Sequence, residues 1–93
     1  MNLSKEQLKE LRDMGELLLP VNIIAANLEV SELELRLELK DSNSSAYKAF
    51  MEGVGKQYAN LHESILRSAN NGSNPAQIEA LKFLAQLKND FMG

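Results

Sequence analysis

Very few side chains in this 93-residue chain have the types and spacing that catalysis or metal binding requires. The only histidine, His62, is followed by Glu63 and Ser64, which point in different directions on a helix and cannot complete a catalytic triad. The Gly-Val-Gly run at 53–55 lacks the Gly-Lys-Ser of a phosphate-binding loop. The acids between residues 29 and 41 lack the spacing of a calcium loop, and the chain has no cysteine. We therefore predict that the protein is not an enzyme and needs no metal or cofactor.

A different chemistry, recognition of double-stranded DNA, is indicated by the spacing of residues 24–31. Their pattern is that of a helix-turn-helix, carried by Ile24-Ala25, Leu28 and Val30-Ser31. In such motifs the second helix enters the major groove and its early residues contact base edges. Arg36 could read a guanine or bind a phosphate, and Glu32 could accept a hydrogen bond from a cytosine. The predicted DNA-binding residues are Ser31, Glu32, Arg36 and Lys40.

The distribution of charge opposes DNA binding by this segment. The whole chain has a net charge of −3 at pH 7. Residues 1–41 hold nine acids and five bases, a net of −4, whereas residues 42–93 hold four acids and five bases, a net of +1. Because DNA affinity comes mostly from Lys and Arg that neutralise phosphates, the half with the DNA-binding spacing has the less favourable charge.

Length and composition predict one small folded domain spanning residues 1–93. The chain is 44% hydrophobic and 25% charged, which is ordinary for a soluble globular protein. Its polar N-terminus lacks the apolar core of a signal peptide, and its longest apolar runs are only a few residues long. We therefore expect a cytoplasmic protein that contacts no membrane.

Turn signals divide the sequence into about five helices, so the predicted fold class is all-α. Ser4 to Gln7 is a capping box that starts a helix, and Pro20 ends it and suits the first turn of a second helix. Ser31 to Glu34 is a second capping box. The position that usually holds glycine in the turn before it is occupied by Glu29, so a non-glycine residue must adopt a tight turn. We assign about residues 4–41 to the helix-turn-helix part of the domain.

Residues 32–40 alternate between leucine and charged residues, which is also the pattern of a half-buried strand. Strong helix formers, the capping box and the lack of a partner strand favour a helix. On a helix, Leu35 and Leu39 lie on one face, and Leu33 and Leu37 lie on nearly the opposite face. One pair can enter the domain core, while the other needs a second layer or another subunit to cover it.

Residues 44–92 are predicted to form an antiparallel helical hairpin. A heptad stripe runs along the first, long helix, which ends near Ala69, and Gly53 and Gly55 permit a bend or a close helix crossing. Asn70-Asn71-Gly72 is a left-handed stop, and Asn74 caps the last helix. The apolar stripe of that last helix is Ile78, Leu81, Leu84, Leu87 and Phe91.

A second hypothesis is a helical protein-interaction or oligomerisation module on the same scaffold, without DNA binding. Ordinary packing within a small bundle would explain the same apolar residues. However, a domain this small has a limited core, and small domains often gain stability by forming oligomers. We therefore expect a homo-oligomer. The predicted oligomer interface is Leu33, Leu37, Tyr47, Met51, Val54 and Tyr58.

Four segments follow one another in an order that resembles a known family. I-A-x-x-L-x-V-S at 24–31 precedes A-Y-K-A-F-M-E-G at 46–53, L-H-E-S-I-L-R-S-A-N-N-G at 61–72 and A-L-K-F-L-A-Q-L-K-N at 80–89. The order resembles the N-terminal region of phage terminase small subunits and related prophage helix-turn-helix proteins, over about residues 20–90. The resemblance implies a non-enzymatic, oligomeric protein in the cytoplasm of a bacterial host, which recognises phage DNA for packaging and presents it to a large terminase subunit. Carried over by position, the DNA-facing residues would be Ser31, Glu32, Arg36 and Lys40.

Overall fold

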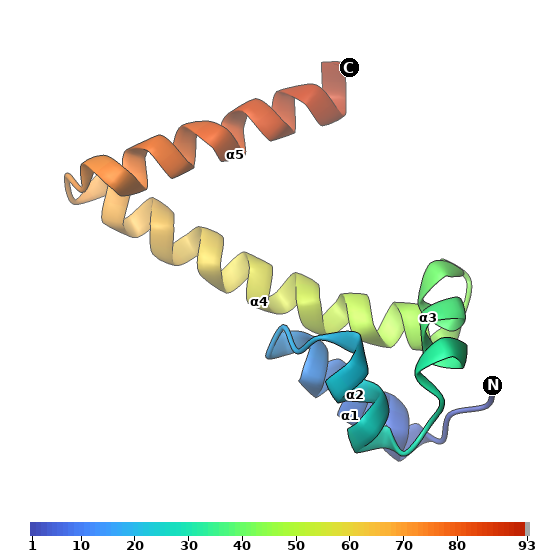
Figure 1. Ribbon diagram of the computed structural model, residues 1–93. Helices are drawn as coiled ribbons and strands as arrows, with labels where there is room; N and C mark the ends of the chain where they lie inside the picture. The colour runs from blue at the N-terminus through green and yellow to red at the C-terminus, as the bar shows by residue number, and fades with distance from the viewer. Residues whose placement is uncertain (93) are drawn as a thin grey trace. The chain divides into compact units, whose positions relative to one another are not determined.

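The computed structural model describes the backbone of residues 1–92 and the side chains of residues 1–90, and this part of the chain is helical without any strand (Figure 1). The five helices are α1 (Lys5–Glu16), α2 (Val21–Leu28), α3 (Glu32–Lys40), α4 (Ser45–Asn70) and α5 (Asn74–Met92). The predicted all-α fold is therefore confirmed. Of the predicted α5 stripe, the Phe91 side chain lies outside the described residues. Among the described helices, none combines the length and apolarity that crossing a membrane requires.

The chain forms two compact units, Met1–Gln57 and Tyr58–Gly93, and the boundary between them lies within α4. The first, here called the N-terminal unit, contains α1, α2, α3 and the beginning of α4. The second, here called the hairpin unit, contains the rest of α4 and α5. The predicted helix-turn-helix segment thus lies entirely within the N-terminal unit.

All four helices of the N-terminal unit contribute to one hydrophobic core. Leu11 of α1, Ile24 of α2 and Leu35 of α3 are fully buried. The other buried apolar residues are Met14, Ala25, Leu28 and Ala46. Phe50 of α4 is half-buried and packs against this cluster. Since α2 and α3 each bury only a narrow face, their outer faces are left uncovered by this unit.

Residues 32–40 form a helix, as predicted, and not a strand. Leu35 has no exposed surface, and Leu39 is half-buried against the same core. Leu33 and Leu37 keep 68% and 59% of their surface exposed. The prediction that one leucine pair enters the core while the other faces outward is therefore confirmed.

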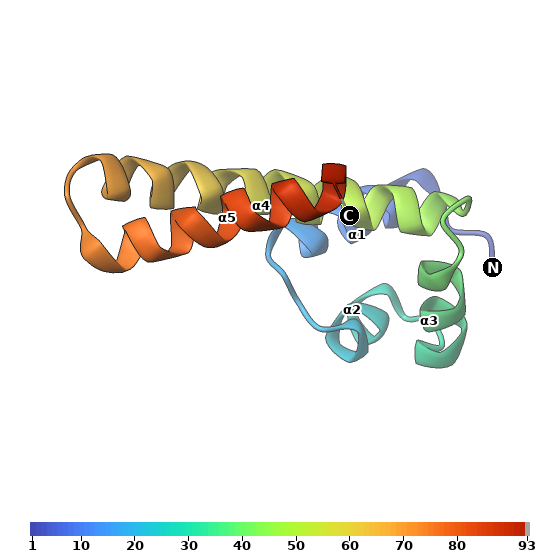
Figure 2. The same cartoon turned by 90° about the horizontal axis from the view of Figure 1, so that it is seen from above.

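Two glycines allow α1 and α4 to touch backbone to backbone. A methyl group on Gly53 would overlap the carbonyl oxygen of Arg12, and one on Gly15 would lie 2.6 Å from the carbonyl oxygen of Phe50. Around Gly55, by contrast, there is open space. The close crossing allowed for by the sequence is thus formed at Gly53, with α1 lying against the first part of α4 (Figure 2).

Ion pairs lie beside this crossing. Arg12 Nη1 is 3.4 Å from Glu52 Oε1, and Lys56 Nζ is 3.2 Å from Glu16 Oε1. All four side chains are substantially exposed, so each pair contributes at most about 1 kcal/mol. The close approach of the two backbones, which lets α4 reach the core, is the larger stabilising feature.

Serine side chains cap α1, α3, α4 and α5, although one predicted cap is displaced. At Ser4 the full capping box is formed: Gln7 N–H donates to Ser4 Oγ at 3.1 Å, and Ser4 N–H donates to Gln7 Oε1 at 2.9 Å. At Ser31 only the serine half is formed, with Glu34 N–H donating to Ser31 Oγ at 3.3 Å. The cap of α5 is Ser73, which accepts from Ala76 N–H at 3.4 Å, so the prediction of Asn74 was wrong by one residue. Asn74 is already helical, and the first helical turn tolerates the proline that follows because its N–H groups have no partner within the helix.

Three helices end in the same left-handed turn. After α2, Glu29 has φ 58°, and Val30 N–H donates to Ala25 O at 3.1 Å. After α1, Leu18 has φ 56° with the equivalent bond, and after α4 Gly72 has φ 94°. The predicted stop at Gly72 and the predicted tight turn at Glu29 are both confirmed. A left-handed conformation costs a residue other than glycine about 1 kcal/mol, so the turn between α2 and α3 is held by the packing around it.

The hairpin unit consists of two helices whose contacts run in antiparallel order. The rings of His62 and Phe83 are 3.7 Å apart between centroids, and Gln77 Nε2 donates to Ala69 O at 3.1 Å. The predicted α5 stripe does not pack against α4, because Ile78, Leu81, Leu84 and Leu87 remain 47–66% exposed. Residues spaced by three drift about 60° around a helix with each step, so they cannot share one face. Phe83 and Ala80 are instead half-buried.

Candidate functional site

The outer face of α3 is the most distinctive surface of the N-terminal unit. Because residues four apart lie in a row along a helix, this face has three rows. A mixed row holds Glu32, Arg36 and Lys40. A ridge holds Leu33 and Leu37, and an acidic row holds Glu34 and Glu38. The helix therefore presents two leucines between a row with two bases and a row with two acids.

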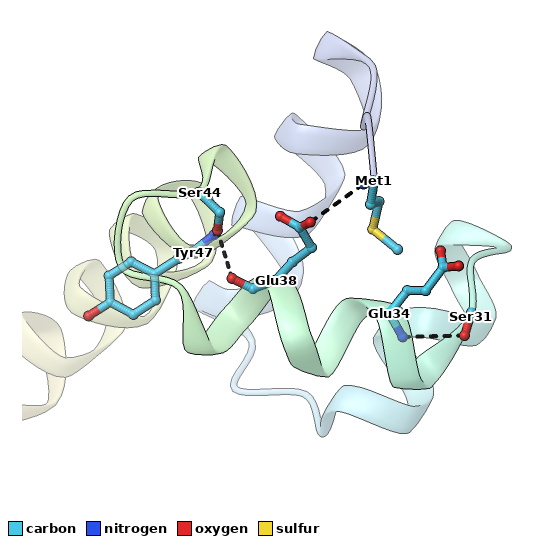
Figure 3. Close-up of polar contacts among 6 residues, drawn as sticks. All are labelled: Met1, Ser31, Glu34, Glu38, Ser44 and Tyr47. Atoms are coloured by element: carbon cyan, nitrogen blue, oxygen red, sulfur yellow. Dashed lines mark hydrogen bonds and ion pairs between the residues drawn. The ribbon is translucent and has the colours of Figure 1, made fainter.

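Three of the four predicted DNA-binding residues lie together, and the fourth has a structural role. Arg36 and Glu32 form an ion pair with 3.2 Å between Arg36 Nε and Glu32 Oε2, and both side chains are about half exposed. Lys40 lies one turn further along the same row and is exposed. Ser31 is exposed and precedes α3, and its hydroxyl caps that helix (Figure 3). The ion pair is exposed and weak, so a phosphate could displace Glu32 from Arg36.

The acidic row of α3 faces away from the two bases. Glu38 accepts from the N-terminal amino group of Met1, with 3.5 Å between nitrogen and Oε1 (Figure 3). With three acids and two bases, α3 as a whole has a net charge of −1. Any anion that binds this helix must therefore approach from the side of Arg36 and Lys40.

Ser44, which was not predicted as a site residue, joins α3 to α4. Its hydroxyl donates to the carbonyl oxygen of Glu38 at 2.7 Å and accepts from Tyr47 N–H at 3.0 Å (Figure 3). One side chain thus satisfies a free carbonyl at the end of α3 and a free N–H at the start of α4. The serine-rich run at 42–45 indicated a cap but not its second partner, which depends on how the chain folds back. Ser44 holds the last turn of α3 in place beneath its outer face.

The predicted oligomer interface is divided between the two units. Leu33, Leu37, Tyr47, Met51 and Val54 belong to the N-terminal unit, and Tyr58 belongs to the hairpin unit. Tyr47 and Val54 are half-buried and Met51 is 41% exposed. The face of α4 that packs into the core is a neighbouring one, formed by Ala46, Ala49, Phe50 and Gly53.

His62 lies between two aromatic rings of the hairpin unit. Its ring lies 4.6 Å from that of Tyr58 and 3.7 Å from that of Phe83, between centroids. His62 Nδ1 is 3.1 Å from the Tyr58 carbonyl oxygen. Within the described residues, no group of three or more His, Cys, Asp and Glu side chains is placed to hold a metal ion.

Comparisons with known proteins give no relative for this chain. No protein-family model matches the sequence, and neither a curated protein nor a solved structure is significantly similar to it. The functional argument therefore starts from the outer face of α3.

Proposed function

We propose that the N-terminal unit binds double-stranded DNA through α3, in a non-enzymatic protein of the phage terminase small-subunit type. The observation that carries the proposal is the exposed outer face of a helix that follows α2 after a tight turn at Glu29. A helix of this kind fits the major groove, where its outward side chains meet base edges. The order of sequence motifs supports the phage setting and a large terminase subunit as the partner that supplies ATPase and nuclease activities.

Arg36 and Lys40 are the residues proposed to contact DNA directly. They share one row of α3, on the side away from Glu34 and Glu38, so they can face phosphates while the acids point elsewhere. Leu33 and Leu37 would lie over the groove floor, where leucine methyl groups can contact thymine methyls. Glu32 opposes binding unless it accepts from a cytosine amino group.

The test is binding of a labelled duplex across a salt series, measured by fluorescence anisotropy. Binding should weaken linearly in a log-log plot against salt, because each neutralised phosphate releases condensed counterions. Arg36→Ala should weaken binding about fivefold or more and reduce the salt slope by about 1. Glu32→Gln should strengthen binding, since it removes a negative charge and frees Arg36 from its ion pair.

Lys88→Ala is the matched control, since it removes one exposed positive charge from the hairpin unit instead of from α3. It should leave affinity and salt slope nearly unchanged. Equal losses for Arg36→Ala and Lys88→Ala would show that binding is not centred on α3. Absence of duplex binding at low salt would exclude the DNA proposal altogether.

A second candidate function is a protein-interaction module that uses the same helix face. The observation that favours it is the exposed ridge of Leu33 and Leu37 on a helix of net charge −1. Apolar residues at i and i+4 are the usual anchors when a helix lies in a hydrophobic groove of another protein. Replacing both leucines, as Leu33→Glu with Leu37→Glu, should dissociate such an assembly in light scattering while circular dichroism stays unchanged. An unchanged assembly in that variant would argue against a role for this ridge.

A further inference from the structure

The hairpin unit lacks a core of its own. Between residues 58 and 90, where side chains are described, none is buried, whereas all the buried apolar residues that the structure describes lie in the N-terminal unit. Most helix stability in proteins comes from packing of an apolar face, not from the helix itself. The large apolar side chains that stay 45–66% exposed in this unit are Tyr58, Leu61, Leu66, Ile78, Leu81, Leu84 and Leu87. Two helices with so much exposed apolar surface need a partner that covers it.

One side of the hairpin forms an open apolar groove. We call this the hairpin groove; it is lined by Leu66, Ala69, Ala80, Leu81 and Leu84. Its volume is about 550 Å³. Two polar residues, Asn70 and Gln77, also line it, and the Gln77 amide already donates to Ala69 O at 3.1 Å. The groove therefore suits the apolar face of another helix better than a polar ligand.

We propose that the hairpin groove packs against the same groove of a second copy of this chain, so that two hairpins form a four-helix bundle with twofold symmetry. Twofold contacts are self-complementary, so each leucine row of one copy meets the small residues of the other. Such bundles bury the apolar faces of two antiparallel helix pairs in a shared core. This inference does not depend on whether α3 binds DNA.

The exposed area suffices for a weak dimer. Leu66, Leu81 and Leu84 are 45%, 66% and 47% exposed, and together they present roughly 300 Å² of apolar surface. At the apolar share of about 65% found in homodimer interfaces, this corresponds to roughly 450 Å² per copy. Standard interfaces bury about 600–1,000 Å² per partner. The hairpin groove lies below that range, as expected for a weak dimer that depends on concentration.

The charges of the hairpin unit permit a second identical copy to approach. The unit has three acids (Glu63, Glu79, Asp90) and three bases (Arg67, Lys82, Lys88), so its net charge is zero. Arg67 pairs with Glu63 at 2.8 Å, and Lys82 pairs with Glu79 at 3.0 Å, both within one copy. The net charge of −3 belongs entirely to the N-terminal unit. Two hairpins therefore meet without like-charge repulsion, whereas two acidic N-terminal units repel each other.

The experiment is sedimentation equilibrium of the full chain over a concentration range that reaches millimolar. The chain should approach twice its 10.4 kDa mass at high concentration. Leu81→Glu with Leu84→Glu should hold it at the monomer mass, because both side chains would enter the shared core. Leu17→Glu with Ile23→Glu is the matched control, with the same change in charge on exposed apolar side chains of the N-terminal unit outside α3, and it should leave the dimer intact.

A single-cysteine reporter tests the interface without disrupting the hairpin. The chain has no cysteine, so Leu84→Cys introduces a unique thiol in the groove. A short bis-maleimide should link two Leu84→Cys chains efficiently and two Leu33→Cys chains poorly. The proposal would be overturned if the chain stayed monomeric at all concentrations and Leu84→Cys chains were not linked. No second copy would then cover the groove. Preferential linkage at Leu33→Cys would overturn it too, by placing the interface on α3.

Discussion

Replacing Gly53 with alanine should destabilise the N-terminal unit by about 3 kcal/mol, near the upper range for overpacking. The added methyl overlaps the Arg12 carbonyl oxygen and would lie 2.9 Å from Glu16 N, both of which are backbone atoms that no side-chain rotation can move. This overlap can be relieved only if α1 and α4 separate, which opens the core beside Leu11. A unit of this size has a total stability of roughly 3–8 kcal/mol, so much of it would be lost.

Gly55→Ala is the control for this prediction. It makes the same chemical change two residues later on the same helix, where there is open space. Alanine should stabilise the helix there by about 1 kcal/mol, through helix propensity alone. Urea denaturation followed by circular dichroism should show midpoints that move in opposite directions for the two variants. Similar stabilisation by both alanines would show that α1 and α4 do not cross at Gly53.

Leu35→Ala should cost about 3 kcal/mol, because it removes a fully buried side chain and leaves a cavity between α1, α2 and α3. Leu37→Ala, two residues later on the same helix, should change the free energy of unfolding by less than about 0.5 kcal/mol, since Leu37 is 59% exposed. Both changes can be measured by urea denaturation, with hydrogen exchange of α2 amides to assign the loss to the N-terminal unit.

The Leu35→Ala and Leu37→Ala variants also test the conformation of residues 32–40 in solution. In a half-buried strand Leu35 and Leu37 would share one face, and both substitutions would be costly. In the helix they lie about 200° apart, so one is buried and the other exposed. Equal losses at the two positions would contradict the helical assignment of this segment.

Local chemistry was sufficient to predict most of the fold from the sequence. The capping box at Ser4, the left-handed stop at Gly72 and the opposite faces of Leu35 and Leu37 depend on residues within one or two turns of each other. The positive φ of Glu29 is also a local feature, because it follows from the spacing of the helix-turn-helix motif. The sequence also predicted that Arg36 and Lys40 lie in one row of α3, since they are four residues apart on a helix.

Features that depend on distant segments were decided by the tertiary structure alone. The face of α4 that enters the core, with Ala46 and Phe50, differs from the neighbouring row of Tyr47, Met51 and Val54, because Gly15 and Gly53 permit α1 to approach on that side. The second partner of Ser44 likewise exists only because the chain turns back from α3 into α4. Periodicity shows that a helix has an apolar face, but not which surface that face meets. The hairpin unit is the clearest example. The sequence predicts two helices with apolar faces, and only the structure shows that their leucines stay exposed when the helices pair.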